Sequence, residues 1–529
     1  MAASYVNPIL PGFFPDPSCI RVEDTFYMIN SSFQFFPGLP IHASKDLVNW
    51  ELIGHAICRP DQLSLEYATT KINNAERKEI FTAGLYAPVI RWHEGIFYIV
   101  CTNLTGTTQT GSDEDFRPYN FLVTSSDLRN PNSFSEVMPF DFHGIDPSLF
   151  FDDDGGVYMQ GSFIHGYRKK PATVIRQAAF DIHTGRLKGD AVDIWTGSGG
   201  KVPEGPHMYK KDGFYWLLIA EGGTHRGHKI TMARSSNIWG PFMSCEQNPL
   251  LTGIKDDEIQ CVGHGELFND THGDWWACML ARREIGSCYP LGRETFMVPV
   301  SWPEKTFPKF EPVELSQILW DRPNLPARQV QTAAESSVLL ASQRTMYLRT
   351  PQLENYAQGE DGKSLLLQCT EVPLGSGSGS PTFLGVRQTS LVSTAEAIVD
   401  LNSLPENCGC GLSLYKDTYR YVSFEIDSAQ RFLRVAALFP EQKLAHHRHI
   451  LLDKATAVKL TITSSVEHYV LSFSVLFHGQ WSHQEGLFRC STANLSGDDF
   501  TGTVYGIYAY GECGTVRFDS FEVRQSIHN

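Results

Sequence analysis

A repeated pattern of short aromatic strands dominates the first 300 residues. Five times, a turn rich in Asp, Glu or Gly leads into such a strand, with the aligned positions at Phe26, Phe97, Val157, Phe214 and Trp275. The intervals of 71, 60, 57 and 61 residues suit one four-stranded blade with generous loops. We therefore predict an all-β fold with a five-bladed β-propeller over residues 1–305. A Greek-key sandwich would also give short strands, but not this recurring order.

Polar residues occur ten or eleven positions before four of the five aligned positions, and Ala87 stands at the fifth. The corresponding dipeptides are Asp16-Pro17, Ala87-Pro88, Asp146-Pro147, Glu204-Gly205 and His264-Gly265. If the aromatic strand is the second of its blade, these residues open the innermost strand, and innermost strands converge on the propeller axis. A lone Asp-Pro is a common turn, but a shared register predicts that Asp16, Asp146, Glu204 and His264 surround one central funnel. Carboxyls placed so closely would have perturbed protonation, as an active site requires.

The remaining sequence predicts a second all-β domain. Residues 306–329 are rich in Pro and polar residues and are predicted to be a linker. From residue 330 to 529, alternating segments at 419–426 and 458–462, with a weaker one at 397–401, predict the strands of a β-sandwich. A Gly- and Ser-rich stretch at 375–380 is predicted to be a flexible loop.

Charge and hydropathy exclude several classes of partner. Asp and Glu number 59 against 44 Lys and Arg, a net charge of −15, which argues against a nucleic-acid backbone or an anionic membrane. The sequence contains no apolar run of membrane-spanning length. Its first residues lack a basic segment followed by an apolar run, so we expect a cytoplasmic protein, or a secreted one if a leader precedes this sequence. Composition leaves the oligomeric state open, a homo-oligomer included.

Several longer motifs resemble glycoside hydrolase family 43, which contains β-xylosidases and α-L-arabinofuranosidases. The resemblance spans residues 7 to about 305 and includes the segments Asn7–Ser18, Phe36–Ile41, His143–Phe150, Pro203–His207, Ala220–Thr224, Gly263–Gly265 and Leu291–Thr295. The family fold is a five-bladed propeller, in agreement with the blade count above. The segment Pro381–Gln388 resembles the C-terminal sandwich that accompanies this propeller in the xylosidase branch.

The resemblance implies roles for the three carboxyls. Asp16 matches the family's general base, Glu204 its general acid, and Asp146 the third carboxylate, which orients the acid and keeps its pKa raised. The implied reaction inverts the anomeric configuration, because Asp16 would activate water on one face while Glu204 protonates the glycosidic oxygen on the other. No cofactor is required. His264 matches a central histidine beside which a Ca²⁺ can lie on the axis, and it would act on that ion through water, since Ca²⁺ prefers oxygen ligands.

The resemblance also suggests residues that contact the sugar. Phe33 matches an aromatic wall of the pocket, and Tyr86 stands where the xylosidase branch often has Trp. Arg293 matches an arginine that reaches sugar hydroxyls, although a structural ion pair is the alternative. Tyr508 or Tyr510 in the sandwich could close one side of the pocket, and we list Tyr510 among the expected substrate contacts. Ordinary core packing is the competing interpretation for each aromatic residue.

These observations predict an exo-acting β-xylosidase that releases xylose from the non-reducing ends of β-1,4-xylo-oligosaccharides. Its partner would be a small oligosaccharide. An α-L-arabinofuranosidase, or an enzyme with both activities, is the close alternative, because xylopyranose and arabinofuranose can present similar hydroxyls to one pocket. A retaining fructosidase uses two Asp and one Glu on the same fold and is a weaker alternative. A glycan-binding propeller without turnover would lack one carboxylate, whereas all three are present.

Overall fold

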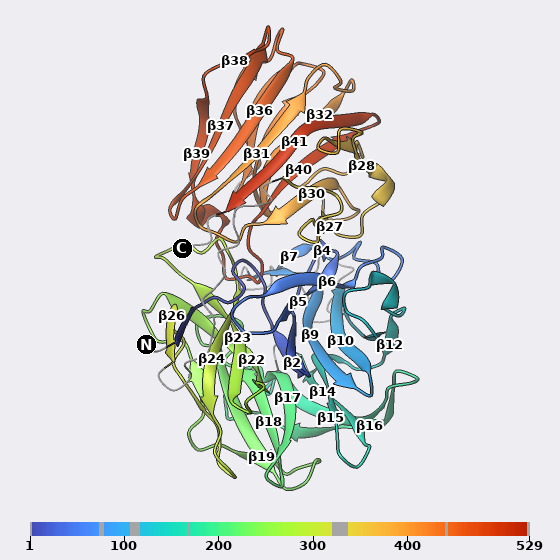
Figure 1. Cartoon of the computed structure of the whole chain (residues 1–529), viewed down its shortest axis with the longest axis vertical. Coiled ribbons are helices and arrows are strands. Elements are labelled where there is room, and N and C mark those ends of the chain that lie inside the picture. The colour runs from blue at the N-terminus through green and yellow to red at the C-terminus, as the bar shows by residue number, and fades with distance from the viewer. Residues whose placement is uncertain are drawn as a thin grey trace.

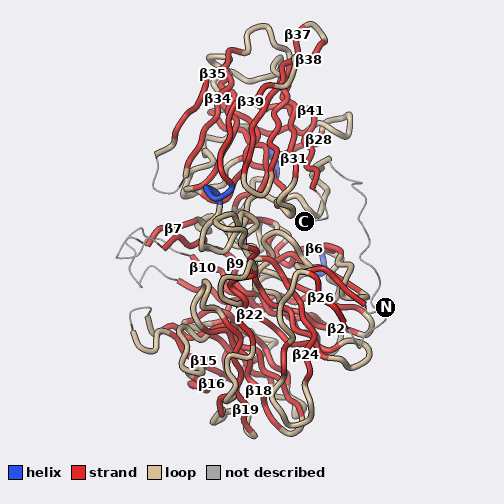
Figure 2. The backbone as a smooth tube through the Cα atoms, turned by 90° about the vertical axis from the view of Figure 1, so that its left-hand side faces the viewer, coloured by secondary structure: helices blue, strands red, loops and turns tan. Residues whose placement is uncertain are grey.

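The protein consists of two β-rich units. Its structure is a computed structural model that describes residues 3–73, 79–105, 117–166, 169–319, 337–439 and 443–525. Figure 1 shows the N-terminal unit below and the C-terminal unit, in orange and red, above it. Figure 2 shows that strands build both units. No helix within these described ranges has the length and apolar character needed to cross a membrane.

The N-terminal unit is the predicted five-bladed β-propeller. Within each blade the strands pair antiparallel in sequence order, so each blade is built from one continuous stretch of chain. Blade 1 contains β2 (Ser18–Val22), β3 (Thr25–Ile29), β5 (Gly38–Ser44) and β6 (Glu51–Ile57). Blade 2 contains β9 (Gly84–His93), β10 (Ile96–Thr105), β11 (Arg117–Ser125) and β12 (Met138–Phe140).

The other three blades repeat this order. Blade 3 contains β13 (Gly144–Phe151), β14 (Val157–Ile164), β15 (Thr173–Asp181) and β16 (Arg186–Trp195). Blade 4 contains β17 (Glu204–Lys211), β18 (Phe214–Glu221), β19 (Lys229–Ser235) and β20 (Met243–Ser244), with β21 (Leu251–Thr252) also paired to β19. Blade 5 contains β22 (Ile259–Asn269), β23 (Trp275–Arg283), β24 (Glu294–Ser301) and β25 (Lys309–Phe310).

The innermost strands close a ring around the axis. Strands β2, β9, β13, β17 and β22 contact one another in this order, and β22 contacts β2 again. The first residues of each innermost strand are fully or nearly fully buried, as the prediction of a central funnel requires. The aromatic strands of the repeat are the second strands of the blades, β3, β10, β14, β18 and β23, which confirms the assumed register.

The propeller unit extends beyond the expected boundary at residue 305. Strand β25 lies in the segment predicted to be linker and forms the outer edge of blade 5. Strand β26 (Ser316–Leu319) then pairs with β1 (Ala3–Val6), so that the segment after blade 5 holds the N-terminal strand. The sequence did not predict either strand, because both are short and β26 pairs with residues more than 300 positions away. Residues 320–329, the rest of the expected linker, lie outside the described residues.

The C-terminal unit is the predicted β-sandwich. One sheet has the order β28 (Tyr356–Gln358), β29 (Leu365–Gln368), β41 (Thr515–Gln525), β31 (Ser393–Asp400), β36 (Ala457–Ser464), β37 (His468–Phe477) and β38 (Gln480–Trp481), with β39 (Glu485–Ser491) also on β37. The other has the order β30 (Thr382–Arg387), β40 (Val504–Gly511), β32 (Cys408–Asp417), β33 (Arg420–Asp427), β34 (Phe432–Leu438) and β35 (Ala445–Leu451). Strands β33, β36 and β31 are the three that the sequence predicted.

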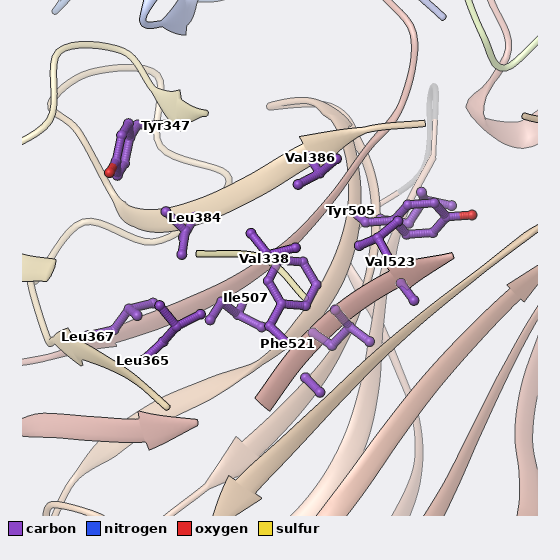
Figure 3. Packing of buried hydrophobic residues seen from close by; sticks show 14 of the residues in the cluster. Val338, Tyr347, Leu365, Leu367, Leu384, Val386, Tyr505, Ile507, Phe521 and Val523 are labelled. Carbon is purple, nitrogen blue, oxygen red and sulfur yellow. The ribbon is translucent and has the colours of Figure 1, made fainter. Parts of the chain in front are cut away.

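Alternating burial explains how the sandwich closes. Along β31, every second side chain is buried, which is the period of a strand with one face on the core. Figure 3 shows the resulting packing, with Ile507 and Tyr505 of one sheet near Phe521 and Val523 of the other.

A short two-stranded sheet joins the two units. Strand β4 (Phe35–Phe36) of the propeller pairs with β27 (Tyr347–Leu348), and the Arg349 amide donates to the Gln34 carbonyl at 2.7 Å. This junction lies directly after Phe33, one of the residues expected in the pocket. The sandwich is thus anchored beside the site.

Candidate active site

The expected site residues sit on a structural feature that recurs in all five blades. In or just before each innermost strand, the residue at the aligned position has a positive φ: Asp16 (52°), Ala87 (39°), Asp146 (55°), Gly205 (56°) and His264 (43°). Register shifts in β13, β17 and β22 fall at the same positions. Such irregularities re-aim side chains next to active sites, and positive φ values in residues other than glycine concentrate at functional positions.

The structure corrects the register of one predicted residue. In blade 4 the residue with positive φ is Gly205, so Glu204 lies one position before the site occupied by Asp16, Asp146 and His264 in their blades. A Cβ atom on Gly205 would lie 2.9 Å from the His264 ring, and the backbone there is left-handed, so glycine is required. The acidic side chain of this blade therefore comes from the preceding residue.

Asp16 is held by partners suited to a carboxylate. The Ser31 hydroxyl donates to Oδ2 of Asp16 at 2.5 Å, and Nη1 of Arg293 lies 3.9 Å from Oδ1. The Ser31 oxygen also accepts a hydrogen bond from the Ala87 amide at 2.7 Å. Ser31 therefore ties the Asp16 carboxylate to the same point of the neighbouring blade, and Asp16 is itself only 7% exposed.

Asp146 and Glu204 have strongly raised pKa values. Burial raises the pKa of Glu204 to about 7; the charge of Arg293 opposes this shift and that of Asp16 adds to it. Burial likewise raises the pKa of Asp146 to about 7; His264 opposes the shift, and Glu204 and Asp16 add to it. The three carboxyls are thus close enough for their charges to interact. Oδ2 of Asp146 also accepts from the Gly205 amide at 3.0 Å, which links it to the backbone next to Glu204.

Three aromatic rings form a wall beside these carboxyls. Phe33 and Tyr86 meet edge to face with centroids 5.2 Å apart, as expected for neighbouring pocket residues. The third ring is Phe500 of the sandwich, stacked on Phe33 at 5.5 Å and edge-on to Tyr86 at 5.6 Å. The guanidinium carbon of Arg293 lies 4.5 Å from the centre of the Phe500 ring, and Nη2 of Arg293 donates to the Thr224 carbonyl at 2.5 Å.

The sandwich residue at the pocket is therefore Phe500, and not Tyr508 or Tyr510. The Tyr510 hydroxyl donates to Glu425 at 2.6 Å, and its ring stacks on that of Tyr508, whose hydroxyl donates to the Phe424 carbonyl at 2.7 Å. Both tyrosine side chains lie on the same face of β40 and reach across β32 to residues of β33. The loop before β40 is the segment that faces the propeller, so an aromatic residue in that loop takes the position expected for Tyr510.

The loop that carries Phe500 is fixed from both sides. On the propeller, the Tyr289 amide donates to the Ser496 hydroxyl at 2.8 Å, and Arg282 pairs with Asp498 at 2.9 Å. On the sandwich, buried Asp499 pairs with Arg420 at 2.9 Å and Lys416 at 3.3 Å. These anchors lie within the four residues before Phe500 and hold its ring in place.

A buried ionic cluster lies on the axis next to the carboxyls. Glu266 of β22 accepts hydrogen bonds from the Ser18 hydroxyl at 2.6 Å and the Cys19 amide at 3.0 Å. It also pairs with Arg91 at 2.7 Å, while Nδ1 of His207 lies 3.2 Å away. Burial alone would raise the pKa of Glu266, but Arg91 and His207 outweigh it and lower that pKa to about 2. Because Ser18 lies two residues after Asp16 and His207 three after Glu204, this carboxylate ties together the strands that carry both acids.

The axis offers no protein cage for a metal ion. Within the described residues, no group of three or more His, Cys, Asp or Glu side chains is arranged to hold a metal. A Ca²⁺ beside His264 would therefore take most of its six to eight oxygen ligands from water.

Sequence reasoning did not identify Ser31, Glu266 or Phe500. Glu266 had a usable signal, because it lies two residues after His264 in the same predicted inner strand. Ser31 and Phe500 had none, since each lies in a loop and reaches the site through contacts with distant segments. Phe33 and Tyr86 lie together, Arg293 lies beside Phe500 and Asp16, and His264 lies beside Gly205. Their contacts with a sugar stay a prediction.

Comparisons with known proteins agree with this architecture. A model described as glycosyl hydrolases family 43 matches residues 5–308, and one described as the beta xylosidase C-terminal concanavalin A-like domain matches residues 343–524. The chain is 31% identical to a non-reducing end alpha-L-arabinofuranosidase of Bacteroides ovatus, covering 98% of this chain and 95% of the relative. It is 34% identical to a xylosidase/arabinosidase of Butyrivibrio fibrisolvens, covering 79% and 78%.

A solved structure extends the likeness to both units. The xylan beta-1,4-xylosidase from Bacillus halodurans superimposes with a TM-score of 0.85 at 27% identity, covering 98% of this chain and 100% of that one. The propeller with its axial carboxyls, the appended sandwich and the family match over more than half of the chain lead to one assignment. The protein is a glycoside hydrolase and belongs to glycosyl hydrolase family 43.

Proposed function

We propose that this enzyme is an exo-acting β-xylosidase that releases xylose from the non-reducing ends of β-1,4-xylo-oligosaccharides with inversion. The observation that carries the proposal is the pairing of Glu204, whose pKa is raised to about 7, with Asp16, which faces a hydroxyl donor and a guanidinium. One carboxyl is suited to donate a proton near neutral pH, and the other to accept one.

The reaction then needs two proton transfers and one displacement. Asp16 takes a proton from a water molecule, whose oxygen attacks the anomeric carbon. The bond to the glycosidic oxygen breaks, and Glu204 gives that oxygen its proton. Glu204 leaves the step as a carboxylate and Asp16 as an acid, so solvent must exchange both before the next turnover. Asp146 acts by orienting the Gly205 backbone beside the acid.

The aromatic wall supports exo action on a single terminal sugar. Phe33, Tyr86 and Phe500 give apolar surface on which one sugar ring can pack, and Arg293 supplies charged donors for its hydroxyls. Because the sandwich contributes Phe500, one side of the pocket is closed by a second domain. A closed side favours chain ends over the interior of a polymer.

An α-L-arabinofuranosidase is the second candidate. It is favoured by the match over nearly the whole chain to the Bacteroides ovatus relative that carries this name. The test is to compare kcat/KM for 4-nitrophenyl β-xylopyranoside and α-L-arabinofuranoside, together with product analysis on xylotriose. The proposal expects the xyloside to be preferred, with xylose and xylobiose as the first products from xylotriose. A preference for the arabinofuranoside would favour the second candidate, and absence of turnover of either would reject both.

A further inference from the structure

A buried histidine next to Glu204 has no part in the mechanism above. His228 immediately precedes β19, and its ring is packed between blades 4 and 5, with its side chain 1% exposed. A Cβ atom on Gly263 of β22 would lie 2.6 Å from this ring, so glycine there makes room for it. Nε2 of His228 lies 3.6 Å from Oε1 of Glu204.

The other ring nitrogen fixes the tautomer of His228. Nδ1 lies 3.3 Å from the Cys261 carbonyl oxygen, which can only accept a hydrogen bond, so Nδ1 carries the hydrogen. Burial lowers the pKa of His228 well below 6.5, and the charges of Arg293, His264 and His225 lower it further. The ring therefore holds one proton, and Nε2 presents a lone pair.

That lone pair discriminates between the two forms of Glu204. Nε2 of His228 is buried and makes no hydrogen bond to the atoms of the described residues. A carboxylic acid can donate its hydrogen to Nε2, and the 3.6 Å separation is one that a small side-chain movement can close. A carboxylate would instead bring a second lone pair against the first, and both groups are buried.

We propose that His228 is a positioning residue that keeps Glu204 in its protonated form and orients its carboxyl group between turnovers. This inference rests on the proposed role of Glu204 as the acid. The imidazole neither gains nor loses a proton in the cycle. After Glu204 has protonated the leaving group, the facing lone pair favours uptake of a new proton from water.

The test variant is His228→Asn, whose side-chain amide can still donate to the Cys261 carbonyl but places no acceptor at the Nε2 position. The kcat/KM of the variant and the parent is measured from pH 5 to pH 9 on xylobiose, whose leaving group needs a proton. Besides His228, the titratable and charged groups around Glu204 are Arg293, Asp16, Asp146 and His264, and all are retained. We expect the alkaline limb of the profile to move to lower pH by about one unit, a tenfold change in proton affinity. The value at pH 5 should stay within about threefold of the parent.

One further substrate and two further variants keep the result interpretable. A 2,4-dinitrophenyl β-xyloside, whose leaving group needs no proton, should lose far less activity at pH 8 than xylobiose does. The ratio of the activities on the two substrates is measured with one preparation, so it does not depend on the fraction of folded enzyme. If His228→Asn does not fold, Gly263→Ala displaces the same ring and should shift the limb in the same direction. His55→Asn, at another buried histidine in β6 (Glu51–Ile57), should leave the limb in place.

Glu204→Gln separates failure of this inference from failure of the proposed function. It should impair xylobiose far more than the dinitrophenyl xyloside; equal losses on both would reject Glu204 as the acid. If Glu204→Gln shows the selective loss but His228→Asn leaves the alkaline limb unmoved, or lowers kcat/KM equally at every pH, the role of His228 is overturned.

Discussion

Replacing Glu204 by Gln should stabilise the folded protein at alkaline pH while it removes the acid. Burial raises the pKa of Glu204 from 4.5 to about 7, so the folded state binds this proton more tightly than the unfolded state. The free energy of unfolding therefore falls as the pH rises from about 4.5 to about 7. The shift corresponds to about 3 kcal/mol of lost stability at pH 8, but to about 1 kcal/mol at pH 5. Gln has nearly the same shape and no charge to bury, so it avoids this loss.

The assay is urea-induced unfolding of parent and variant at pH 5 and pH 8, followed by tryptophan fluorescence. We expect the free energy of unfolding to be higher for the variant than for the parent, and this difference to be about 2 kcal/mol larger at pH 8 than at pH 5. Glu406→Gln, at an exposed position in the sandwich, is the matched control and should show no such pH dependence. A gain from Glu204→Gln that is equal at both pH values, or a loss at pH 8, would refute the reasoning.

Three further predictions concern the carboxyl cluster and its wall. Asp16→Ala should lower kcat by about 10²–10⁴-fold, while circular dichroism should show that the propeller is still folded. Undiminished hydrolysis would show that Asp16 is not a catalytic residue. Phe500→Ala should raise KM about tenfold with a smaller change in kcat, because it removes a ring stacked on Phe33. As a control, Phe432→Ala in β34 of the sandwich should leave KM unchanged. Glu266→Gln should lower the urea midpoint by the equivalent of about 3 kcal/mol, since Arg91 loses its buried partner, and an unchanged midpoint would contradict the axial cluster.

The blades could be predicted because their pairing is local. Each blade consists of neighbouring antiparallel strands, so one spacing between turns and aromatic strands locates all five. The end of the propeller could not be predicted, because β26 pairs with β1 across nearly the whole length of the unit. A pairing of that kind leaves no pattern in the sequence around either strand.

The site was predictable to the extent that the blade repeat determines it. Asp16, Asp146 and His264 occupy the same position in three blades, which the sequence register indicated. Glu204 is displaced by one residue, because the left-handed backbone falls on Gly205 beside the His264 ring. The position of Phe500 depends on how the sandwich docks onto the propeller, and local sequence does not encode docking.

The protonation states also required the structure. The sequence predicted one raised carboxyl, but burial raises the pKa of both Asp146 and Glu204 to about 7. These shifts depend on how deeply each group lies and which charges surround it, and neither quantity follows from the order of residues.

The most direct test of the central claim is the configuration of the sugar at the moment of its release. Asp16 and Glu204, acting as base and acid on opposite faces of the anomeric carbon, must invert it in a single displacement. Proton NMR during the first minutes of xylobiose hydrolysis should therefore detect α-xylose appearing ahead of its mutarotation equilibrium. Initial release of β-xylose would mean that a protein group attacks the sugar directly, and would contradict the account.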